Sequence, residues 1–196
     1  DYGAGNIFSV KNALDFLGME NRLTSSAKDI ESADAVILPG VGAFPKAMDM
    51  LEKSGLIETI QIQARKKPFL GICLGLQLLF RRSDESDGVE GLSILPGEIL
   101  RIPDAPGIKI PHIGWNSLKV SEGARLFEGL GENPYVYFVH SYYLKADDES
   151  IVVATTEYGG TIIHASVQKD NVYACQFHPE KSGSVGMQIL KNFAAL

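Results

Sequence analysis

The first half of the chain alternates short, continuously apolar runs with segments of helical periodicity, and this alternation constrains the fold most. The apolar runs cover residues 35–38 (AVIL), which stop at Pro39-Gly40, and residues 69–72 (FLGI). Short runs that are apolar at every position are typical of strands buried on both faces of a sheet. Helical spacing is expected over residues 7–17, 43–53, 56–66 and 74–80. Strands that alternate with helices predict parallel β-α-β units in an open α/β sheet.

The second half of the chain is rich in β-branched and aromatic runs separated by turn residues, which indicate strands, several of them antiparallel. These strands are expected over residues 99–102, 117–120, 135–139, 151–156, 161–167 and 172–177, with a closing helix over 183–195. A turn over residues 1–6 (DYGAGN) should follow a strand that is absent from this sequence. The 196 residues are expected to form a single domain, 1–196. Its predicted fold class is α/β, a three-layer open and mostly parallel sheet with additional antiparallel strands in the C-terminal half.

Composition excludes several functional classes. The formal net charge is −6 and no basic run is present, so neither nucleic acid nor an anionic membrane surface is expected as a partner. No apolar stretch approaches the roughly 20 residues of a membrane helix, and no signal peptide is seen, so a cytoplasmic location is expected. The two cysteines, Cys73 and Cys175, lie in neither a CxxC nor a CxxH pattern. We therefore expect no metal site and no cofactor.

Residues 71–75 (GICLG) place Cys73 between a buried strand and a helix, in the G-x-nucleophile-x-G pattern of a nucleophile elbow. A tight strand-to-helix turn brings the second residue on either side so close that a Cβ would clash, and Gly71 and Gly75 occupy these positions. The free N–H groups at the start of the following helix stabilise a thiolate and can hold an oxyanion. The pattern predicts a nucleophilic cysteine; the alternative is a buried cysteine with incidental glycines.

His178 is the histidine best placed to act as the base for this thiol. It lies in residues 176–180 (QFHPE), and it alone of the four histidines has a carboxylate two positions on, at Glu180. Residues i and i+2 of an extended chain face the same side, and Pro179 favours extended geometry at His178. Glu180 can therefore accept the second N–H of the imidazole as the third member of a triad. Structural or binding roles are expected for the remaining histidines, His112, His140 and His164.

At these two motifs the chain resembles the class I (triad) glutamine amidotransferases, and the resemblance spans nearly its whole length. It rests on residues 71–77 (GICLGLQ) and 176–182 (QFHPEKS). A closer resemblance, to the glutaminase subunits of imidazole glycerol phosphate synthases in histidine biosynthesis, rests on residues 1–6 (DYGAGN), 39–44 (PGVGAF), 111–116 (PHIGWN) and 138–142 (FVHSY). Many other amidotransferases have a glycine pair in place of the G-V-G of residues 40–42. The resemblance implies a flavodoxin-like fold.

The resemblance implies hydrolysis of L-glutamine to glutamate and ammonia through a thioester on Cys73. His178 would take the thiol proton and return it to the leaving nitrogen. Backbone N–H groups of Val41 and Leu74 would form the oxyanion hole, and the Val41 peptide is expected to turn inward when a partner is loaded. The residues implied to hold the glutamine are Gly42, Gln77, Ser141 and Tyr142. An ordinary position on a helix surface is the alternative for Gln77.

A partner follows from the chemistry of the product, because ammonia is protonated at neutral pH and loses its nucleophilicity. The resemblance implies a heterodimer with a (β/α)8-barrel cyclase subunit that makes imidazole glycerol phosphate and AICAR. The candidates for the interface or tunnel mouth are Asn12, Trp115, Asn116, Tyr137 and Lys181. Gly114 and Asn116 indicate a turn that exposes Trp115, the only tryptophan, at an interface. A tryptophan of the core is the alternative.

Three other functions are considered. The first is the glutaminase subunit of another class I amidotransferase, for pyridoxal phosphate, purine or anthranilate synthesis, and the G-V-G loop and the segment around Trp115 argue against it. The second is a cysteine peptidase or hydrolase built on the same elbow. The third is a catalytically silent binding subunit, against which the complete triad argues. Release of glutamate from free glutamine, without action on peptides, distinguishes these functions.

Overall fold

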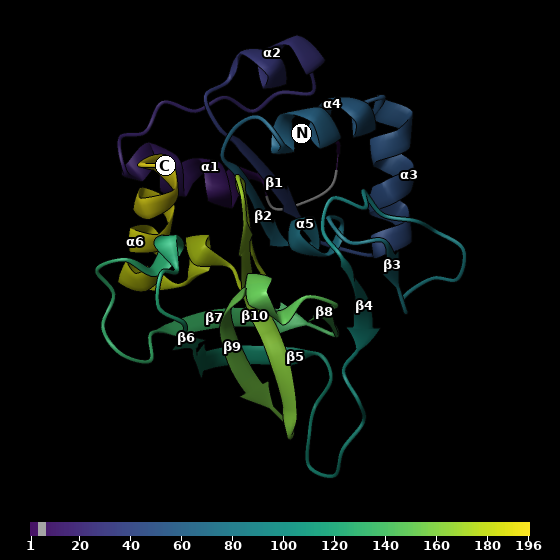
Figure 1. The fold of residues 1–196 in the computed structure, drawn as a ribbon, viewed down its shortest axis with the longest axis vertical. Helices are drawn as coiled ribbons and strands as arrows, with labels where there is room; N and C mark the ends of the chain where they lie inside the picture. The colour runs from purple at the N-terminus through teal and green to yellow at the C-terminus, as the bar shows by residue number, and fades with distance from the viewer. Residues whose placement is uncertain (4–6) are drawn as a thin grey trace.

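A six-stranded mixed sheet forms the centre of the computed structural model, which describes residues 1–3 and 7–196 (Figure 1). The expected turn over residues 1–6 therefore lies partly outside the described residues. The strand order is β1-β2-β11-β10-β9-β6. The parallel strands are β1 (Val36–Gly40), β2 (Phe69–Cys73) and β11 (Val172–Cys175). The antiparallel strands that follow are β10 (Thr161–Lys169), β9 (Val152–Tyr158) and β6 (Lys119–Val120). The expected α/β class, with antiparallel strands in the C-terminal half, is confirmed.

Two separate apolar clusters cover the two faces of this sheet, which makes the fold three-layered. Neighbouring residues of one strand face opposite sides, so Phe69 belongs to one cluster and Leu70 to the other. The helices on the Phe69 side are α2 (Ala27–Ser32), α3 (Phe44–Ser54), α4 (Ile57–Ala64) and α5 (Leu74–Gln77). Those on the Leu70 side are α1 (Ile7–Phe16) and α6 (Gly183–Ala194). Figure 1 shows the two groups of helices on either side of β1 and β2.

Two smaller sheets extend the second half of the chain. One pairs β5 (His112–Ser117) with β7 (Tyr135–His140) in antiparallel fashion. The other has the order β3-β4-β8 and is made of β3 (Arg82–Ser83), β4 (Gly97–Arg101) and β8 (Tyr142–Ala146). Three short 3-10 turns are η1 (Arg125–Phe127), η2 (Glu149–Ile151) and η3 (Pro179–Lys181). Because β7 and β8 are separated only by Ser141, the two small sheets meet beside the C-terminal end of β2.

The expected helix over residues 74–80 is too long. Regular α-helix ends at Gln77, and the chain continues in tighter turns, in which the Leu79 N–H donates to the Leu76 carbonyl and the Phe80 N–H to the Gln77 carbonyl. The Leu78 carbonyl accepts from the N–H of Leu92, and the Leu79 carbonyl accepts from that of Ile94. Tertiary contacts therefore override the helical periodicity here.

The strand expected over residues 117–120 is also wrong in its bounds. Ser117 ends β5 and Lys119 begins β6, and the two strands belong to different sheets. Leu118, whose side chain is fully buried, marks the crossing and donates its N–H to the Pro134 carbonyl. The turn expected around Trp115 is likewise wrong, since this residue lies within β5 and pairs with Tyr137.

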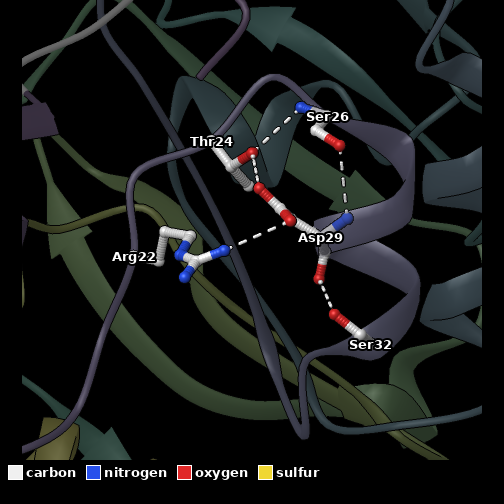
Figure 2. A network of polar contacts seen from close by, with 5 residues as sticks. All are labelled: Arg22, Thr24, Ser26, Asp29 and Ser32. Carbon is white, nitrogen blue, oxygen red and sulfur yellow. Dashed lines mark hydrogen bonds and ion pairs between the residues drawn. The ribbon is translucent and has the colours of Figure 1, made fainter.

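The sequence analysis does not predict helix α2, because a helix of six residues is too short to show a helical pattern of apolar residues. Polar groups define it instead (Figure 2). The Ser26 hydroxyl caps the helix by accepting from the N–H of Asp29, and the Asp29 carboxylate accepts from the Thr24 hydroxyl at 2.8 Å. Arg22 pairs with the same carboxylate at 3.3 Å. Among the described residues, no helix has the length and hydropathy needed to cross a membrane.

Candidate active site

Cys73 lies at the sharp turn where β2 ends and α5 begins. Its backbone has φ 55° and ψ −110°, a strained conformation for a residue with a side chain. A Cβ on Gly75 would lie 1.8 Å from the carbonyl oxygen of Leu38, and one on Gly71 would lie 2.8 Å from that of Gly75. Glycine is therefore required on both sides by direct backbone contact, as the G-x-C-x-G pattern predicts. The elbow presents the sulfur at the carboxyl edge of the parallel strands.

Hydrogen bonds of the backbone fix His178 beside this edge. Its N–H donates to the Tyr137 carbonyl at 3.0 Å, which attaches the segment after β11 to β7. The Ser182 hydroxyl donates to the His178 carbonyl at 2.6 Å and accepts from the Tyr137 N–H at 3.0 Å. Pro179 opens the η3 turn and leaves His178 extended, with ψ 98°. The imidazole is thus held by two strands and a serine that the sequence analysis did not single out.

Glu180 holds the imidazole of His178 through Nδ1. The Nδ1 atom lies 2.7 Å from the Glu180 carboxylate, and only 2% and 1% of the two side chains are exposed. Burial alone would lower the pKa of His178, but the neighbouring Cys73 sulfur and the Glu180 carboxylate together raise it to about 9. Within the described part of the chain, Nε2 of His178 has no hydrogen-bond partner. The ring is therefore oriented from one side and free on the side of the sulfur.

The sulfur of Cys73 has two further polar neighbours. The side-chain amide of Gln176 donates to it at 3.7 Å, and the Val139 carbonyl lies 4.0 Å away, where a thiol S–H can donate. Gln176 was not among the expected site residues, although it stands two positions before His178, directly after β11. Its period-two spacing from His178 was the available signal. The second cysteine, Cys175, is fully buried, and burial raises the pKa of its thiol.

The residues expected to form the oxyanion hole flank the same turn. Leu74 is the first residue of α5, so its N–H has no partner within the helix. Val41 follows directly after β1, and β1 pairs with β2 so that Gly40 is opposite Cys73. The Val41 side chain is 40% exposed, and Gly42 has a positive φ of 106°. Both expected donors therefore belong to segments that meet at the nucleophile.

Of the residues expected to hold glutamine, Gln77 is buried rather than at a helix surface. Its amide nitrogen donates to the Tyr142 carbonyl at 3.2 Å and to the Gln176 side-chain carbonyl at 3.1 Å. Ser141 and Tyr142 are half-buried at the junction of β7 and β8. The junction is fixed by the Ser141 carbonyl, which accepts from the Ile102 N–H at 2.9 Å. These residues are brought together on the side of Cys73 that faces β8.

A buried histidine pair lies behind this junction. His112 Nδ1 and His140 Nε2 are 3.0 Å apart, and His140 Nδ1 lies 2.8 Å from the Tyr142 carbonyl. His112 Nε2 is 3.0 Å from the Asn116 side-chain oxygen, so this expected interface residue also contacts the pair. Burial lowers the pKa of both histidines, that of His140 to about 4. The pair therefore joins β5, β7 and the start of β8 in one polar network.

Three of the expected interface residues form an aromatic and basic surface next to the triad. The rings of Trp115 and Tyr137 meet edge to face with centroids 6.0 Å apart, and Lys181 Nζ lies 6.0 Å from the Tyr137 ring centroid. Trp115 is 52% exposed. Asn12 is exposed on α1, a helix that contacts η3. The expectation that Trp115 is exposed holds, although it is a strand and not a turn that exposes it.

A cavity away from the triad has a volume of about 840 Å³. It is lined by residues between Arg81 and Glu98 together with Asp147. Its lining contains neither a cysteine nor a histidine, so the elbow remains the site with the stronger chemistry. In residues 1–3 and 7–196, no group of three or more His, Cys, Asp or Glu side chains is arranged to hold a metal ion.

Comparison with known proteins bears on this site. The model of the family "Glutamine amidotransferase class-I" matches residues 1–196. The "Imidazole glycerol phosphate synthase subunit HisH" of Caldanaerobacter subterraneus subsp. tengcongensis is 51% identical over 197 residues, covering 100% of this chain and 96% of that protein. The protein of the same name from Methanothermobacter thermautotrophicus is 50% identical, with the same coverage. A crystal structure described as a glutamine amidotransferase aligns with TM-score 0.74 and 21% identity, covering 97% of this chain and 95% of that one. The chain therefore belongs to the class I glutamine amidotransferases and, within them, to the HisH subunits of imidazole glycerol phosphate synthase.

Proposed function

We propose that this chain hydrolyses L-glutamine with the triad Cys73, His178 and Glu180 and supplies the ammonia to a cyclase subunit in histidine biosynthesis. The observation that carries the proposal is the imidazole of His178, fixed at Nδ1 by a buried carboxylate 2.7 Å away and unpartnered at Nε2 among the described residues. A strained elbow presents the Cys73 sulfur to that nitrogen. A nucleophile, a base and an orienting carboxylate in this arrangement perform acyl transfer.

The raised pKa of His178 sets the order of the proton transfers. The Cys73 sulfur and the Glu180 carboxylate raise the pKa of His178 to about 9, which favours the ring as the acceptor of the thiol proton. The thiolate attacks the amide carbon of glutamine, and His178 gives its Nε2 proton to the nitrogen that leaves as ammonia. The neutral ring then takes a proton from water, and the resulting hydroxide attacks the thioester. Collapse of that adduct expels the Cys73 sulfur and releases glutamate, so His178 acts in turn as a base and as an acid.

The oxyanion of both tetrahedral intermediates would be held by backbone N–H groups of Leu74 and Val41. The Leu74 N–H has no partner within α5, and a fixed N–H dipole at the start of a helix stabilises developing charge without reorganisation. Gly40 and Gly42 flank Val41 and make the Gly40–Val41 peptide the movable element of the hole. Turning of this peptide upon partner loading remains part of the proposal.

Gln77 would contact the substrate through its carbonyl oxygen. Both of its amide contacts, to the Tyr142 carbonyl and to Gln176, use the nitrogen. An amide has two N–H donors, so what remains available is an acceptor. An acceptor is suited to the ammonium group of glutamine and unsuited to its carboxylate. Gly42, Ser141 and Tyr142 are retained as the other proposed contacts to glutamine.

The surface around Trp115 is the proposed docking site for the cyclase, which the sequence resemblance identifies as a (β/α)8 barrel. An exposed tryptophan beside Tyr137 and a lysine provides aromatic anchors with a charged rim. The Tyr137 carbonyl accepts the His178 N–H, so this surface lies directly against the triad. Asn12 is a proposed contact at its edge. A cytoplasmic location is retained in the proposal, and the two free cysteines agree with a reducing compartment.

Cys73→Ala tests the function in the complex with the cyclase. The variant should lose glutamine-dependent turnover while cyclisation supplied with an ammonium salt continues at the wild-type rate. Cys175→Ala is the matched control, since this buried cysteine has no proposed role, and it should keep both activities. Glutamine-dependent turnover by Cys73→Ala would refute the proposed nucleophile. Hydrolysis of peptides by the wild-type protein would favour a peptidase instead.

A further inference from the structure

Gln176 is a fully buried amide whose role neither the triad nor the proposed glutamine contacts explain. We propose that it is a further catalytic residue, which donates a hydrogen bond to the Cys73 sulfur and stabilises the thiolate, and that Gln77 holds it in the required orientation. The inference rests on the proposed function, since it takes Cys73 as the nucleophile. Gln176 is 0% exposed, and its amide nitrogen lies 3.7 Å from the sulfur.

The orientation of this amide is fixed by a chain of contacts that begins at a backbone carbonyl. An amide side chain can turn its oxygen or its nitrogen toward a neighbour, so its direction follows from its partners. The Tyr142 carbonyl can only accept, so Gln77 must present its nitrogen there, at 3.2 Å. The same nitrogen donates at 3.1 Å to the Gln176 oxygen, which turns the Gln176 nitrogen toward Cys73. The Tyr142 carbonyl is itself held by His140 Nδ1 at 2.8 Å.

The two neighbours of the sulfur favour different protonation states. The Val139 carbonyl, 4.0 Å from the sulfur, can accept from a thiol S–H but repels a thiolate. The Gln176 N–H interacts more strongly with a thiolate, because hydrogen bonds to charged groups are about twice as strong as those between neutral groups. Removal of the thiol proton therefore strengthens the Gln176 contact and makes the Val139 contact unfavourable. In this geometry the Gln176 amide acts on the reacting atom itself.

The spacing of the chain places this donor on the same side as the triad. Gln176 follows β11 and continues its pairing, since its N–H donates to the Ala165 carbonyl at 2.9 Å. Gln176, His178 and Glu180 follow β11 within one short segment that ends in the η3 turn, so the amide, the imidazole and the carboxylate arise from nearby positions in the chain. This one segment would thus supply the sulfur with a hydrogen-bond donor and with the acid–base group.

The test measures alkylation of Cys73 by iodoacetamide as a function of pH in the full chain, followed by peptide mass spectrometry. Gln176→Leu removes the donor, whereas Gln176→Glu keeps the acceptor for Gln77 and turns a carboxylate toward the sulfur. We expect alkylation at pH 7 to slow by about 10-fold or more in Gln176→Leu, the loss typical of a hydrogen bond to a charged group, and further in Gln176→Glu. Both profiles should move to higher pH and reach the wild-type rate where the thiol is fully ionised.

Gln188→Leu is the matched control, because Gln188 also donates its amide to a side chain, that of Asn192 on α6, away from the sulfur. It should leave the alkylation profile unchanged. The proposal is overturned if Gln176→Leu, with wild-type circular dichroism, keeps the wild-type profile, or if its rate falls equally at every pH. It is also overturned if the profile moves while glutamine hydrolysis by the same protein does not slow. Since alkylation needs no glutamine, this test is independent of whether Cys73→Ala loses glutaminase activity.

Discussion

Gly75→Ala is the substitution that tests the elbow geometry most sharply. The added Cβ would lie 1.8 Å from the Leu38 oxygen and 2.8 Å from its carbon, both backbone atoms of β1. Relief of this contact requires β1 and α5 to separate by more than an ångström, and overpacking of this kind costs about 3 kcal/mol or more. The higher helix propensity of alanine returns about 1 kcal/mol. The net loss in the free energy of unfolding is therefore at least about 2 kcal/mol.

Urea unfolding followed by circular dichroism measures this loss, and a thermal scan should show a Tm lower by about 4–8 °C for a chain of this size. Gly131→Ala is the control: its Cβ meets nothing within 4 Å and its backbone requires no positive φ. The control should be neutral or more stable by up to about 1 kcal/mol. Unfolding of Gly75→Ala at the same urea concentration as the wild type would contradict the close contact between Gly75 and the Leu38 carbonyl of β1.

Three further predictions concern charge and recognition. In Cys73→Ser the partner of the imidazole can no longer carry a negative charge, so the pKa of His178 should fall below about 9, and an unchanged NMR titration would contradict this. The pKa of His140, about 4 in the fold, lies below its unfolded value, so its contribution to stability is full above pH 6.5 and is lost, by about 3 kcal/mol, as pH falls from 6.5 to 4. In His140→Phe the urea midpoint should therefore depend less on pH in this window, and an equally steep decline would contradict the assignment. Trp115→Ala should weaken cyclase binding by about 2 kcal/mol in calorimetry. Ile162 on β10 is equally exposed, and Ile162→Ala should not weaken binding; equal effects would refute the docking surface.

Local chemistry made much of this fold and site predictable from sequence. The apolar runs before Pro39 and Cys73 have the composition of buried parallel strands, and both strands are present. Contacts with backbone atoms require glycine on either side of Cys73, so this requirement is visible in the sequence as the G-x-C-x-G pattern. The pairing of His178 with Glu180 was expected from extended geometry, and the pair is present, although Glu180 lies in the η3 turn and not in extended chain.

Features that depend on tertiary contacts could not be predicted. α5 ends at Gln77, and the Leu78 and Leu79 carbonyls accept from Leu92 and Ile94, contacts that helical periodicity cannot predict. Trp115 lies in a strand because β7 pairs with it, despite the turn-like residues on either side. The contact of Gln176 with Cys73 joins residues far apart in the chain, and its orientation is set by Gln77 and the Tyr142 carbonyl. Such chains of hydrogen bonds between distant residues can be identified only in the folded structure.

The central claim, that Cys73 is the nucleophile that attacks glutamine, is tested most directly by covalent labelling. A glutamine analogue with a diazo ketone in place of the side-chain amide should alkylate Cys73 and abolish glutamine hydrolysis in proportion to labelling. Free glutamine should protect, and Cys175, fully buried, should remain unmodified. The account predicts a single labelled peptide containing Cys73. Labelling of another residue in step with loss of activity, or full labelling of Cys73 with activity retained, would contradict it.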